Sequence, residues 1–310
     1  MNLQQLEYIV AVAELKSFTK AADYCCVTQA TLSAMVKKLE SELEVVLFDR
    51  KANPIVCTDI GKELVQKAKV ILKELEGLKD MVKDAQASVE GKVRLGIIPT
   101  VANALLPLIL KPLLQSFPLL ELEITELTTR NIISQLRSGS LDLGILATPL
   151  HEENIQVSPL YYEPLLVYGR EGKTYYLPEE IQQEQIWLME EGHCLREQTL
   201  ELCSLKRNDS VAAQLKFEAN SFGTLLNLVD DFGGMTIIPE LYAKRLSPER
   251  KQKIGHFLAP TPVREISLVA YRPFAKNRII KALTPSIKAL VKPHLSLDHQ
   301  NKDLLRITKL

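Results

Sequence analysis

The side chains best suited to covalent chemistry in this 310-residue sequence are its five cysteines, two of which, Cys194 and Cys203, lie nine residues apart. The stretch from Gly192 to Leu205 is predicted to form a turn followed by a helix, because its leucines recur on one helical face. If that helix is continuous between the two cysteines, it turns by about 900° and rises by about 13.5 Å, which leaves the sulfurs on opposite faces. A disulfide requires Cα atoms roughly 4.4–6.8 Å apart. If the two cysteines bond within one chain, the helix must therefore unwind, and the segment is a two-state redox switch.

Cys194 is better placed than Cys203 to react first with an oxidant. It lies near the predicted helix start, where the dipole stabilises a thiolate and lowers its pKa, and His193 and Arg196 are its neighbours in sequence. Attack on peroxide would give a sulfenic acid, which condenses with a second thiol such as Cys203. The alternative is that both cysteines are small buried hydrophobic side chains. The spacing alone leaves both interpretations open.

The other three cysteines are expected to have no redox role. Cys25 and Cys26 are adjacent, Cys57 stands alone, and no histidine lies near them in the sequence. The sequence contains no C-x-x-C motif, so we expect no metal site and no cofactor.

Composition and charge exclude several classes of protein. Lysine and arginine number 38, as do aspartate and glutamate, so the chain has no overall attraction to nucleic acid or anionic membranes. No apolar run approaches the roughly 18 residues that would span a bilayer. The first residues lack the basic region of a signal peptide, so we expect a cytoplasmic protein in which a disulfide scaffold is excluded.

The elements that must position these residues begin with a helical N-terminal region. Residues 3–13 have helical hydrophobic spacing, Ser17 is a candidate cap for the following helix, and Thr28 is a candidate cap for the next. That third helix has an apolar inner face, formed by Leu32, Met35, Val36 and Leu39. Two short helices joined by a tight turn indicate a helix-turn-helix.

A hairpin and a long helix are predicted to follow. Residues 45–50 and 55–57 are β-branched runs around an Asn-Pro turn, which predicts a small wing. Thr58 is predicted to cap a helix that runs to about Gln86. Its apolar positions form an a/d seam of Leu64, Ala68, Ile71, Leu75, Leu78 and Val82. We favour a dimer seam, because no nearby helix remains to cover this stripe; the alternative is that the helix packs on its own domain.

From Ser88 the pattern becomes α/β. Strands are expected at 93–98, 120–127 and 141–147, with helices at 104–115 and 131–137 between them, and this alternation predicts parallel strands. A second set runs from Leu165 to Ile238, and the chain returns through a strand at 266–271 and a helix at 278–291. Two α/β lobes with a cleft between them would result.

Several of these segments resemble the DNA-binding signature of the LysR-type transcriptional regulators. The matching residues are Ser17-Phe18-Thr19-Lys20-Ala21-Ala22, Val27-Thr28-Gln29-Ala30-Thr31-Leu32-Ser33, Leu39-Glu40, Leu43, Leu47-Phe48-Asp49-Arg50 and Thr58-Asp59-Ile60-Gly61. The rest of the chain resembles the hydrogen-peroxide sensors of that family. The marks are Gly96-Ile97-Ile98-Pro99-Thr100-Val101, Gly192-His193-Cys194-Leu195-Arg196 with Cys203 following, Gly234-Met235-Thr236-Ile237-Ile238-Pro239, and Arg264 ahead of Leu268-Val269-Ala270-Tyr271-Arg272-Pro273.

The resemblance implies a fold class of α plus α/β. It implies an N-terminal winged helix-turn-helix at 1–57, a linker and dimerisation helix at 58–87, and a regulatory domain at 88–310 built like a periplasmic binding protein. Its two lobes would be residues 88–161 with 262–310, and residues 162–261. It also implies a transcription activator of the oxidative stress response that is switched by a reversible Cys194–Cys203 disulfide.

The resemblance further implies a peroxide pocket beside the reactive cysteine. Thr100 and Thr129 match hydroxyl groups that would hold the peroxide, and Arg264 matches a cation that would support the thiolate alongside His193 and Arg196. A hydroxyl that donates to one peroxide oxygen would stabilise charge on the leaving hydroxide. Alternatively, Thr100 only caps the helix after the first strand.

Candidate DNA contacts lie on the outer face of the recognition helix and in the wing. They are Thr28, Gln29, Thr31, Ser33 and Lys37 on the helix and Arg50 in the wing, where the family places an arginine at the minor groove. Residues 1–87 hold 12 Lys and Arg against 13 Asp and Glu, so this region is not basic. Binding would therefore depend on a local patch and on several binding heads in one oligomer.

The resemblance implies a homotetramer on promoter DNA, with hydrogen peroxide as signal, RNA polymerase as partner, and re-reduction by glutaredoxin or thioredoxin. Two alternatives remain. A LysR-type regulator could bind a small metabolite between the lobes, with both cysteines incidental, and thiol titration before and after peroxide would distinguish it. A thiol peroxidase would leave the helix-turn-helix unexplained, so we expect no enzymatic activity; turnover with excess thioredoxin would indicate otherwise.

Overall fold

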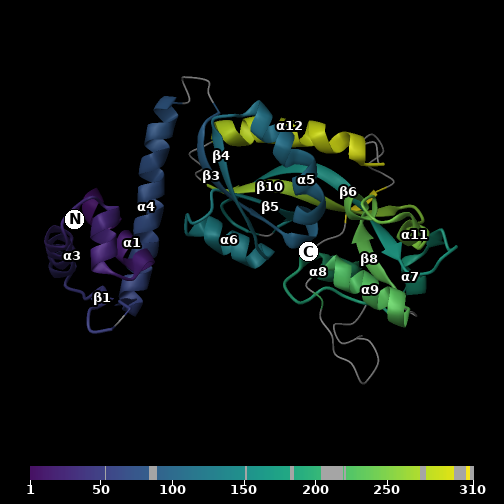
Figure 1. Cartoon of the computed structure of the whole chain (residues 1–310), viewed down its shortest axis with the longest axis horizontal. Helices are drawn as coiled ribbons and strands as arrows, with labels where there is room; N and C mark the ends of the chain where they lie inside the picture. The colour runs from purple at the N-terminus through teal and green to yellow at the C-terminus, as the bar shows by residue number, and fades with distance from the viewer. Residues whose placement is uncertain are drawn as a thin grey trace. The chain divides into compact units, whose positions relative to one another are not determined.

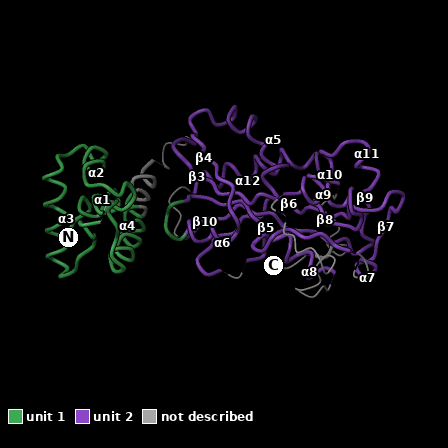
Figure 2. Tube along the Cα trace, turned by 60° about the horizontal axis from the view of Figure 1, so that its bottom comes forward, with its two compact units in different colours: residues 1–87, 137–140, 273–276 green, residues 88–136, 141–272, 277–310 purple. Residues whose placement is uncertain are grey.

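The computed structural model describes residues 1–52, 54–83, 89–150, 152–181, 185–203, 219, 221–272, 277–296 and 305–307; within these, the side chains of 73, 76–83, 305 and 306 are not described. The chain forms two compact units, one built chiefly from residues 1–87 and the other from most of the remainder (Figure 2). No helix in the described ranges is both long and apolar enough to cross a membrane.

The first unit begins with the predicted helix-turn-helix. Its helices are α1 (Leu3–Leu15), α2 (Phe18–Tyr24) and α3 (Gln29–Leu43). The predicted caps are confirmed: the Ser17 hydroxyl accepts a hydrogen bond from the Lys20 amide, and the Thr28 hydroxyl accepts one from the Thr31 amide. Cys26 adopts a left-handed conformation with φ of 54° where the chain turns between α2 and α3.

The wing and the long helix complete this unit. The wing is an antiparallel pair of β1 (Phe48–Asp49) and β2 (Val56–Cys57), shorter than the predicted runs. The long helix α4 (Asp59–Lys83) starts where the Thr58 hydroxyl accepts from the Gly61 amide.

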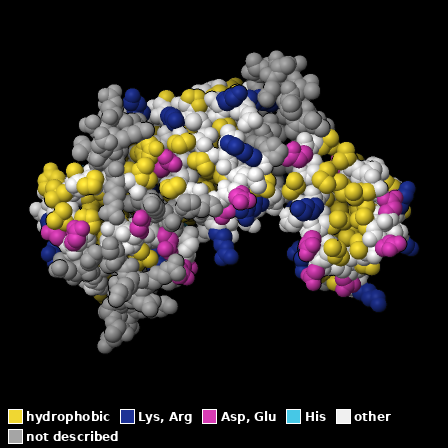
Figure 3. All heavy atoms as spheres, turned by 180° about the vertical axis from the view of Figure 1, so that it is seen from behind, with side chains coloured by type: hydrophobic (Ala, Val, Ile, Leu, Met, Phe, Trp, Pro, Cys, Tyr) yellow, Lys and Arg dark blue, Asp and Glu magenta, His cyan; other side chains and the backbone are white. Residues whose placement is uncertain are grey.

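The predicted apolar seam of α4 is divided between two environments. Ala68 is buried in the core of its own unit and Leu64 packs on that core, so the first turns follow the alternative interpretation. Ile71 is 42% exposed. The face of this unit that Figure 3 shows carries a group of hydrophobic side chains. Leu75 is half-buried, and the side chains of Leu78 and Val82 lie outside the described residues. A dimer contact of the exposed part of the seam stays a prediction.

The second unit is built on a mixed sheet. In spatial order, its strands are β4 (Leu120–Glu126), β3 (Gly91–Ile97), β5 (Leu143–Thr148), β10 (Thr261–Tyr271), β6 (Ile155–Tyr168), β9 (Ile254–Phe257) and β7 (Tyr175–Tyr176). Two further strands pair off this path: β8 (Thr236–Pro239) with β6 and β11 (Leu305–Ile307) with β10. The parallel pairing expected from βαβ alternation holds for β3 with β4 and β5, but β10 is antiparallel to both β5 and β6. The alternation predicted parallel pairing for the first three strands only. The direction of the returning strand, which enters the middle of the sheet between β5 and β6, was not part of that prediction.

Helices cover the sheet, and their bounds are as follows: α5 (Pro99–Ser116), α6 (Thr129–Arg137), α7 (Pro178–Ile181), α8 (Cys194–Leu202), α9 (Phe222–Phe232), α10 (Glu240–Ala243), α11 (Pro248–Lys251), α12 (Asn277–Val291) and the 3₁₀ turn η2 (Lys292–His294). Figure 1 shows α12 above the strands and α6 below them, and α12 packs against α5. The helix α5 starts at Pro99, five residues earlier than predicted, because a proline at the first helical position fits the helix without loss of a hydrogen bond.

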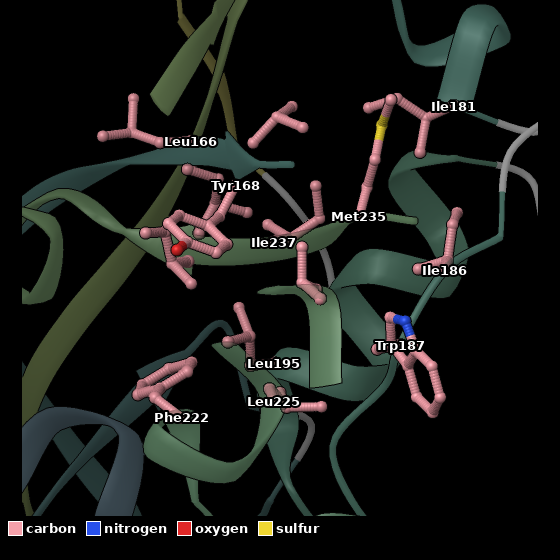
Figure 4. Packing of buried hydrophobic residues seen from close by; sticks show 14 of the residues in the cluster. Leu166, Tyr168, Ile181, Ile186, Trp187, Leu195, Phe222, Leu225, Met235 and Ile237 are labelled. Carbon is pink, nitrogen blue, oxygen red and sulfur yellow. The ribbon is translucent and has the colours of Figure 1, made fainter. Parts of the chain in front are cut away.

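The second half of this unit has a hydrophobic core of its own, formed by residues between 165 and 257. Figure 4 shows Leu195 of α8 in this cluster beside Leu225 and Phe222 of α9. Leu202 and Cys203 are buried in the same cluster, so one face of α8 is anchored in the core. The α plus α/β fold class expected from the sequence is confirmed.

Candidate functional site

Two threonines stand where adjacent parallel strands end. Thr100 follows β3 in the first turn of α5, and Thr129 follows β4 as the first residue of α6. Because the carboxyl ends of parallel strands meet at one edge of a sheet, this is the edge at which α/β folds place their ligands. Both hydroxyls therefore lie at helix N-termini, where a negative charge is stabilised.

Cys194 reaches the same edge from the other half of the unit. It is the first residue of α8, with His193 in the N-cap position, and only 8% of it is exposed. Its sulfur is hydrogen-bonded to the hydroxyl of Thr129. The structure thus brings together a thiol and a hydroxyl that lie 65 residues apart in the chain.

A buried ion pair completes this cluster. Arg264 on β10 and Glu163 on β6 are each 1% exposed, and their closest nitrogen and oxygen atoms are 2.8 Å apart. The guanidinium also donates to the hydroxyl of Thr100 at 3.2 Å and to its carbonyl oxygen at 3.1 Å. The other oxygen of Glu163 accepts from the Leu241 amide at 2.8 Å. This carboxylate therefore fixes the guanidinium in position by holding it against Thr100.

The pKa of the Cys194 thiol is set by two opposing influences. Burial raises the pKa of Cys194, while the hydrogen bond from Thr129 and the positive charge of Arg264 lower it; burial is the larger influence. The expectation of a lowered pKa was therefore wrong for this conformation, because the sequence gives no measure of desolvation.

His193 and Arg196 were expected to support the thiolate, and neither is among the groups that shift the pKa of Cys194 here. Arg196 instead donates to the Met189 carbonyl oxygen at 2.8 Å, which ties the start of α8 to the preceding loop. His193 is buried, with 7% of it exposed. The cation that acts on the sulfur is Arg264, which lies 70 residues further along the chain.

Cys203 lies at the opposite end of α8. It is the C-cap residue and is fully buried in the core. Because α8 is continuous from Cys194 to Leu202, the two Cα atoms are separated by about 13.5 Å of helical rise, beyond the range of a disulfide. The five cysteines all lie in the described residues, and none of them is in a disulfide. The helical separation predicted from the spacing is therefore present.

Gln198, which sequence reasoning missed, lies one turn after Cys194 on the same face of α8. It is fully buried, and within the described residues neither its amide nitrogen nor its carbonyl oxygen has a hydrogen-bond partner. An unpaired buried amide destabilises its conformation by roughly 1–3 kcal/mol. The reduced arrangement of α8 therefore contains a built-in unfavourable contribution.

Most of the predicted DNA-contact residues on α3 are exposed, and some also have hydrogen-bond partners within the unit; Gln29 accepts from the Thr19 hydroxyl at 3.0 Å. Gln29, Thr31 and Lys37 are exposed on α3. The hydroxyl of Thr28 caps α3 and contacts the hydroxyl of Thr31 at 2.8 Å. Thr28 therefore stabilises the start of α3, with or without a contact to DNA.

Arg50, predicted to reach DNA from the wing, is held by α3 and α2. Its guanidinium forms an ion pair with Glu40 at 2.8 Å, donates to the half-buried Ser33 at 3.2 Å, and lies over the ring of Phe18 at 4.9 Å. Contact with a phosphate would require Arg50 to share or leave these partners. Arg50 therefore connects the start of the wing loop to the recognition helix.

A metal centre has no support within the described part of the chain, where no group of three or more His, Cys, Asp and Glu side chains could hold an ion.

The comparisons with known families match both units. Residues 3–62 match the model of the bacterial regulatory helix-turn-helix proteins of the LysR family, and residues 86–288 match the model of the LysR substrate-binding domain.

Known proteins resemble the chain over nearly its full length. The DNA-binding transcriptional dual regulator OxyR of Escherichia coli K12 is 37% identical over 303 residues, which cover 95% of this chain and 97% of that protein. A hydrogen peroxide-inducible genes activator of Haemophilus influenzae is 34% identical over 94% of this chain and 99% of its own length. A solved full-length OxyR variant from Pseudomonas aeruginosa superposes with a TM-score of 0.75 and 29% identity, covering 93% of this chain and 98% of that one.

Proposed function

Because the chain belongs to the LysR family of bacterial transcriptional regulators, we propose that it is a hydrogen-peroxide sensor that regulates transcription of oxidative-stress genes. One observation carries this proposal. The Cys194 thiol lies against the Thr129 hydroxyl and within the field of Arg264, while an intact α8 separates it from Cys203. A reactive thiol and a distant second thiol on one short helix are the two parts that a redox switch requires.

In the first step, the thiolate of Cys194 attacks one oxygen of hydrogen peroxide. A sulfur–oxygen bond forms, the oxygen–oxygen bond breaks, and the leaving hydroxide takes up a proton to become water. The product is the Cys194 sulfenic acid, with the sulfur oxidised and the peroxide reduced. Thr129 and Thr100, at two helix N-termini, would donate to the peroxide oxygens, and Arg264 would stabilise the negative charge as it moves from sulfur to the leaving oxygen.

In the second step, the Cys203 thiol attacks the Cys194 sulfur, the sulfur–oxygen bond breaks, and water leaves. The resulting disulfide brings the two Cα atoms to within roughly 4.4–6.8 Å, which a helix of this length does not allow. Helix α8 therefore unwinds, and Leu195 and Leu202 leave the places they hold in the core. The covalent change at one sulfur thus becomes a repacking of this half of the unit.

The repacking would reach the promoter through the assembly. We propose a homotetramer on promoter DNA whose heads change their spacing when α8 unwinds, which alters recruitment of RNA polymerase. The family resemblance supports this arrangement, and it supports re-reduction of the disulfide by glutaredoxin or thioredoxin. The DNA-binding unit would carry the contacts through the exposed Gln29, Thr31 and Lys37 on α3.

The decisive experiment is mass mapping of thiols on the full-length protein after a brief pulse of substoichiometric peroxide. We expect sulfenic acid at Cys194 first, then a Cys194–Cys203 disulfide, with Cys25, Cys26 and Cys57 unchanged. The variant Cys194→Ser should bind the same DNA as the parent protein and show no change in its DNA footprint on oxidation. A Cys194→Ser protein whose footprint responds normally to peroxide would remove Cys194 from the mechanism.

A second candidate function is regulation by a small metabolite bound between the lobes, as the substrate-binding domain model allows. Thiol titration distinguishes the two. A metabolite regulator would keep both thiols after peroxide exposure and would respond equally well with Cys194 and Cys203 replaced by serine.

A further inference from the structure

A hollow of about 300 Å³ lies in the second unit, and none of the residues that line it takes part in the proposed mechanism. Strand β6 supplies one wall through Leu160, Tyr161 and Tyr162, and the end of α12 with η2 supplies the other through Lys288, Lys292 and Leu295. The helix α12 packs against β6 along this side of the sheet (Figure 1). A volume of roughly 300 Å³ is at the lower end of the range for sites that hold small organic ligands.

The floor and the rim of this hollow differ in polarity. Leu160 and Tyr161 are 3% exposed, so the floor is made of an aliphatic side chain and an aromatic ring held in the core. Lys288 and Lys292 are exposed at the rim. In the described part of the chain, no carboxylate lies within ion-pairing distance of either ammonium group.

The hydroxyl of Tyr161 is buried, and it has no hydrogen-bond partner within the described residues. It lies in the field of the Glu163 carboxylate and the Arg264 guanidinium, whereas the neighbouring Tyr162 donates to Glu265 at 2.6 Å. Tyr161 therefore contributes apolar surface to the hollow, and the polar groups available to a ligand are those at the rim.

We propose that this hollow is a binding site for a small organic monocarboxylate with an aromatic or aliphatic body. The body would lie on Leu160 and the ring of Tyr161, and the carboxylate would lie between the ammonium groups of Lys288 and Lys292. Two ammonium groups at the rim favour a ligand with a negative charge over its neutral analogue. An apolar floor disfavours strongly hydrated inorganic anions. The site would therefore discriminate against both the neutral analogue and a bare anion such as acetate.

Lys288 and Lys292 could also stabilise the end of α12 without binding a ligand, and the experiment must distinguish these two roles. Cations near the end of a helix interact favourably with its dipole, so Lys288 and Lys292 could serve only to stabilise α12. A purely stabilising role predicts a change in unfolding temperature on their removal but no dependence on any ligand. A binding role predicts a loss of ligand affinity that is independent of the starting stability.

The test is titration of the reduced full-length protein with phenylacetate by isothermal calorimetry, with acetate and phenylacetamide as matched compounds. We expect saturable binding of phenylacetate with a Kd of about 1 mM or tighter, a value reasonable for a ligand of this size. Phenylacetamide and acetate should each bind at least tenfold more weakly. Absence of saturable binding, or equal binding of phenylacetate and its amide, overturns the proposal.

Variants place the site. The double variant Lys288→Met with Lys292→Met should weaken phenylacetate binding at least tenfold, and Ala289→Trp, at an exposed position that lines the hollow, should abolish it by filling the space. Lys281→Met is the matched control, since it removes one exposed charge from the same helix two turns away and should leave binding unchanged. Binding that survives Ala289→Trp, or that falls as much in Lys281→Met as in the double variant, places the ligand elsewhere and overturns the assignment.

Discussion

At the residue scale, the reactivity of Cys194 depends on a balance rather than on one activating neighbour. The sulfur is buried, which raises its pKa, and a hydroxyl and a guanidinium act in the opposite direction. Only the thiolate attacks peroxide, so each of these groups changes the reactive fraction. Thr129 and Arg264 therefore each have a separate, measurable effect on the pKa of Cys194.

Replacement of Thr129 by valine should slow the reaction of Cys194. Valine keeps the shape of the side chain but removes the hydrogen bond to sulfur, so the pKa of Cys194 rises further. A hydrogen bond of about 0.5–1.5 kcal/mol corresponds to a rate about two- to thirteenfold lower at pH 7. Peptide-resolved alkylation by iodoacetamide measures this rate, and Thr125→Val, at an exposed position on β4 four residues before Thr129, is the control. An unchanged rate at Cys194 would mean that Thr129 does not act on the sulfur.

The same balance predicts the pH dependence. Because the pKa of Cys194 is raised above its usual value, the thiolate fraction at neutral pH is small. The rate of alkylation should therefore rise about tenfold per pH unit between about pH 6 and pH 8, without a plateau. Peptide-resolved alkylation across this range checks it. A rate that levels off below neutral pH would show that the thiol is already ionised there.

Sequence patterns identified part of this site and missed the rest. Cys194, Thr129 and Arg264 follow from matched motifs, and the structure brings them into one cluster. Glu163 was missed, although a carboxylate inside the apolar run 160–167 is a signal that a buried cation must lie opposite it. Gln198 could not have been found, because only the packed structure reveals that its amide is unpaired.

At the element scale, α8 is both stabilised and destabilised by side chains that it buries. Leu195 and Leu202 are buried in the core, whereas the buried amide of Gln198 has no hydrogen-bond partner within the described residues. In the proposed switch, the equilibrium between the helix and the disulfide-bonded form depends on the difference between these contributions. Substitutions of the leucines and of Gln198 should therefore move the reduction potential of the cysteine pair in opposite directions.

Replacement of Gln198 by methionine should stabilise the reduced form. Methionine has a similar volume and removes the unpaired amide, so the helical state gains about 1–2 kcal/mol over the parent protein. For a two-electron couple this moves the potential of the Cys194–Cys203 pair to a less negative value by about 20–40 mV. Equilibration with glutathione buffers measures the shift. Gln115→Met, at an exposed position near the end of α5, should leave the potential unchanged.

Replacement of Leu195 by alanine should have the opposite effect. The side chain is 1% exposed in the helical state, and its truncation destabilises that state by about 2–5 kcal/mol. If oxidation withdraws Leu195 from the core, the disulfide form does not share the loss, and the potential becomes more negative by about 40–100 mV. Leu225→Ala truncates a neighbour in the same core that lies on α9, so it should lower the stability of both forms equally and leave the potential where it was. Equal potentials for the two alanine variants would contradict the unwinding of α8.

Element prediction succeeded where local signals suffice and failed where distant strands decide. The caps at Ser17, Thr28 and Thr58 were found because each is a local hydrogen-bond pattern. The second set of elements was expected to begin at Leu165, whereas β6 begins at Ile155 and contains Pro159. The sheet accommodates that proline by a register shift opposite β10, which is a tertiary arrangement that periodicity does not encode.

At the scale of the whole molecule, the charge of the DNA-binding region sets how DNA recognition must work. Residues 1–87 carry 12 basic and 13 acidic residues, so a single region has no general attraction for phosphates. Each head therefore contributes few phosphate contacts, and the affinity of an assembly would come from linking several heads on one DNA. Such an arrangement is suited to a switch, because a change in head spacing alters the binding without any new contact in a head.

The salt dependence of DNA binding tests this argument. If each head contacts phosphates through only a few cationic side chains, each of them supplies a large share of the salt dependence. Lys37→Ala should therefore reduce the slope of log K against log salt by about one for every head that binds. The slope of the full-length protein on duplex DNA, measured by fluorescence anisotropy, then also reports how many heads are engaged. Lys111→Ala removes an exposed charge of the same kind from α5 in the other unit and should leave the slope unchanged. A reduction of the slope well above one for Lys37→Ala identifies a linked assembly, because a single head has only one Lys37 to lose. A reduction of about one means that each complex uses a single head, and the several-headed arrangement is then wrong.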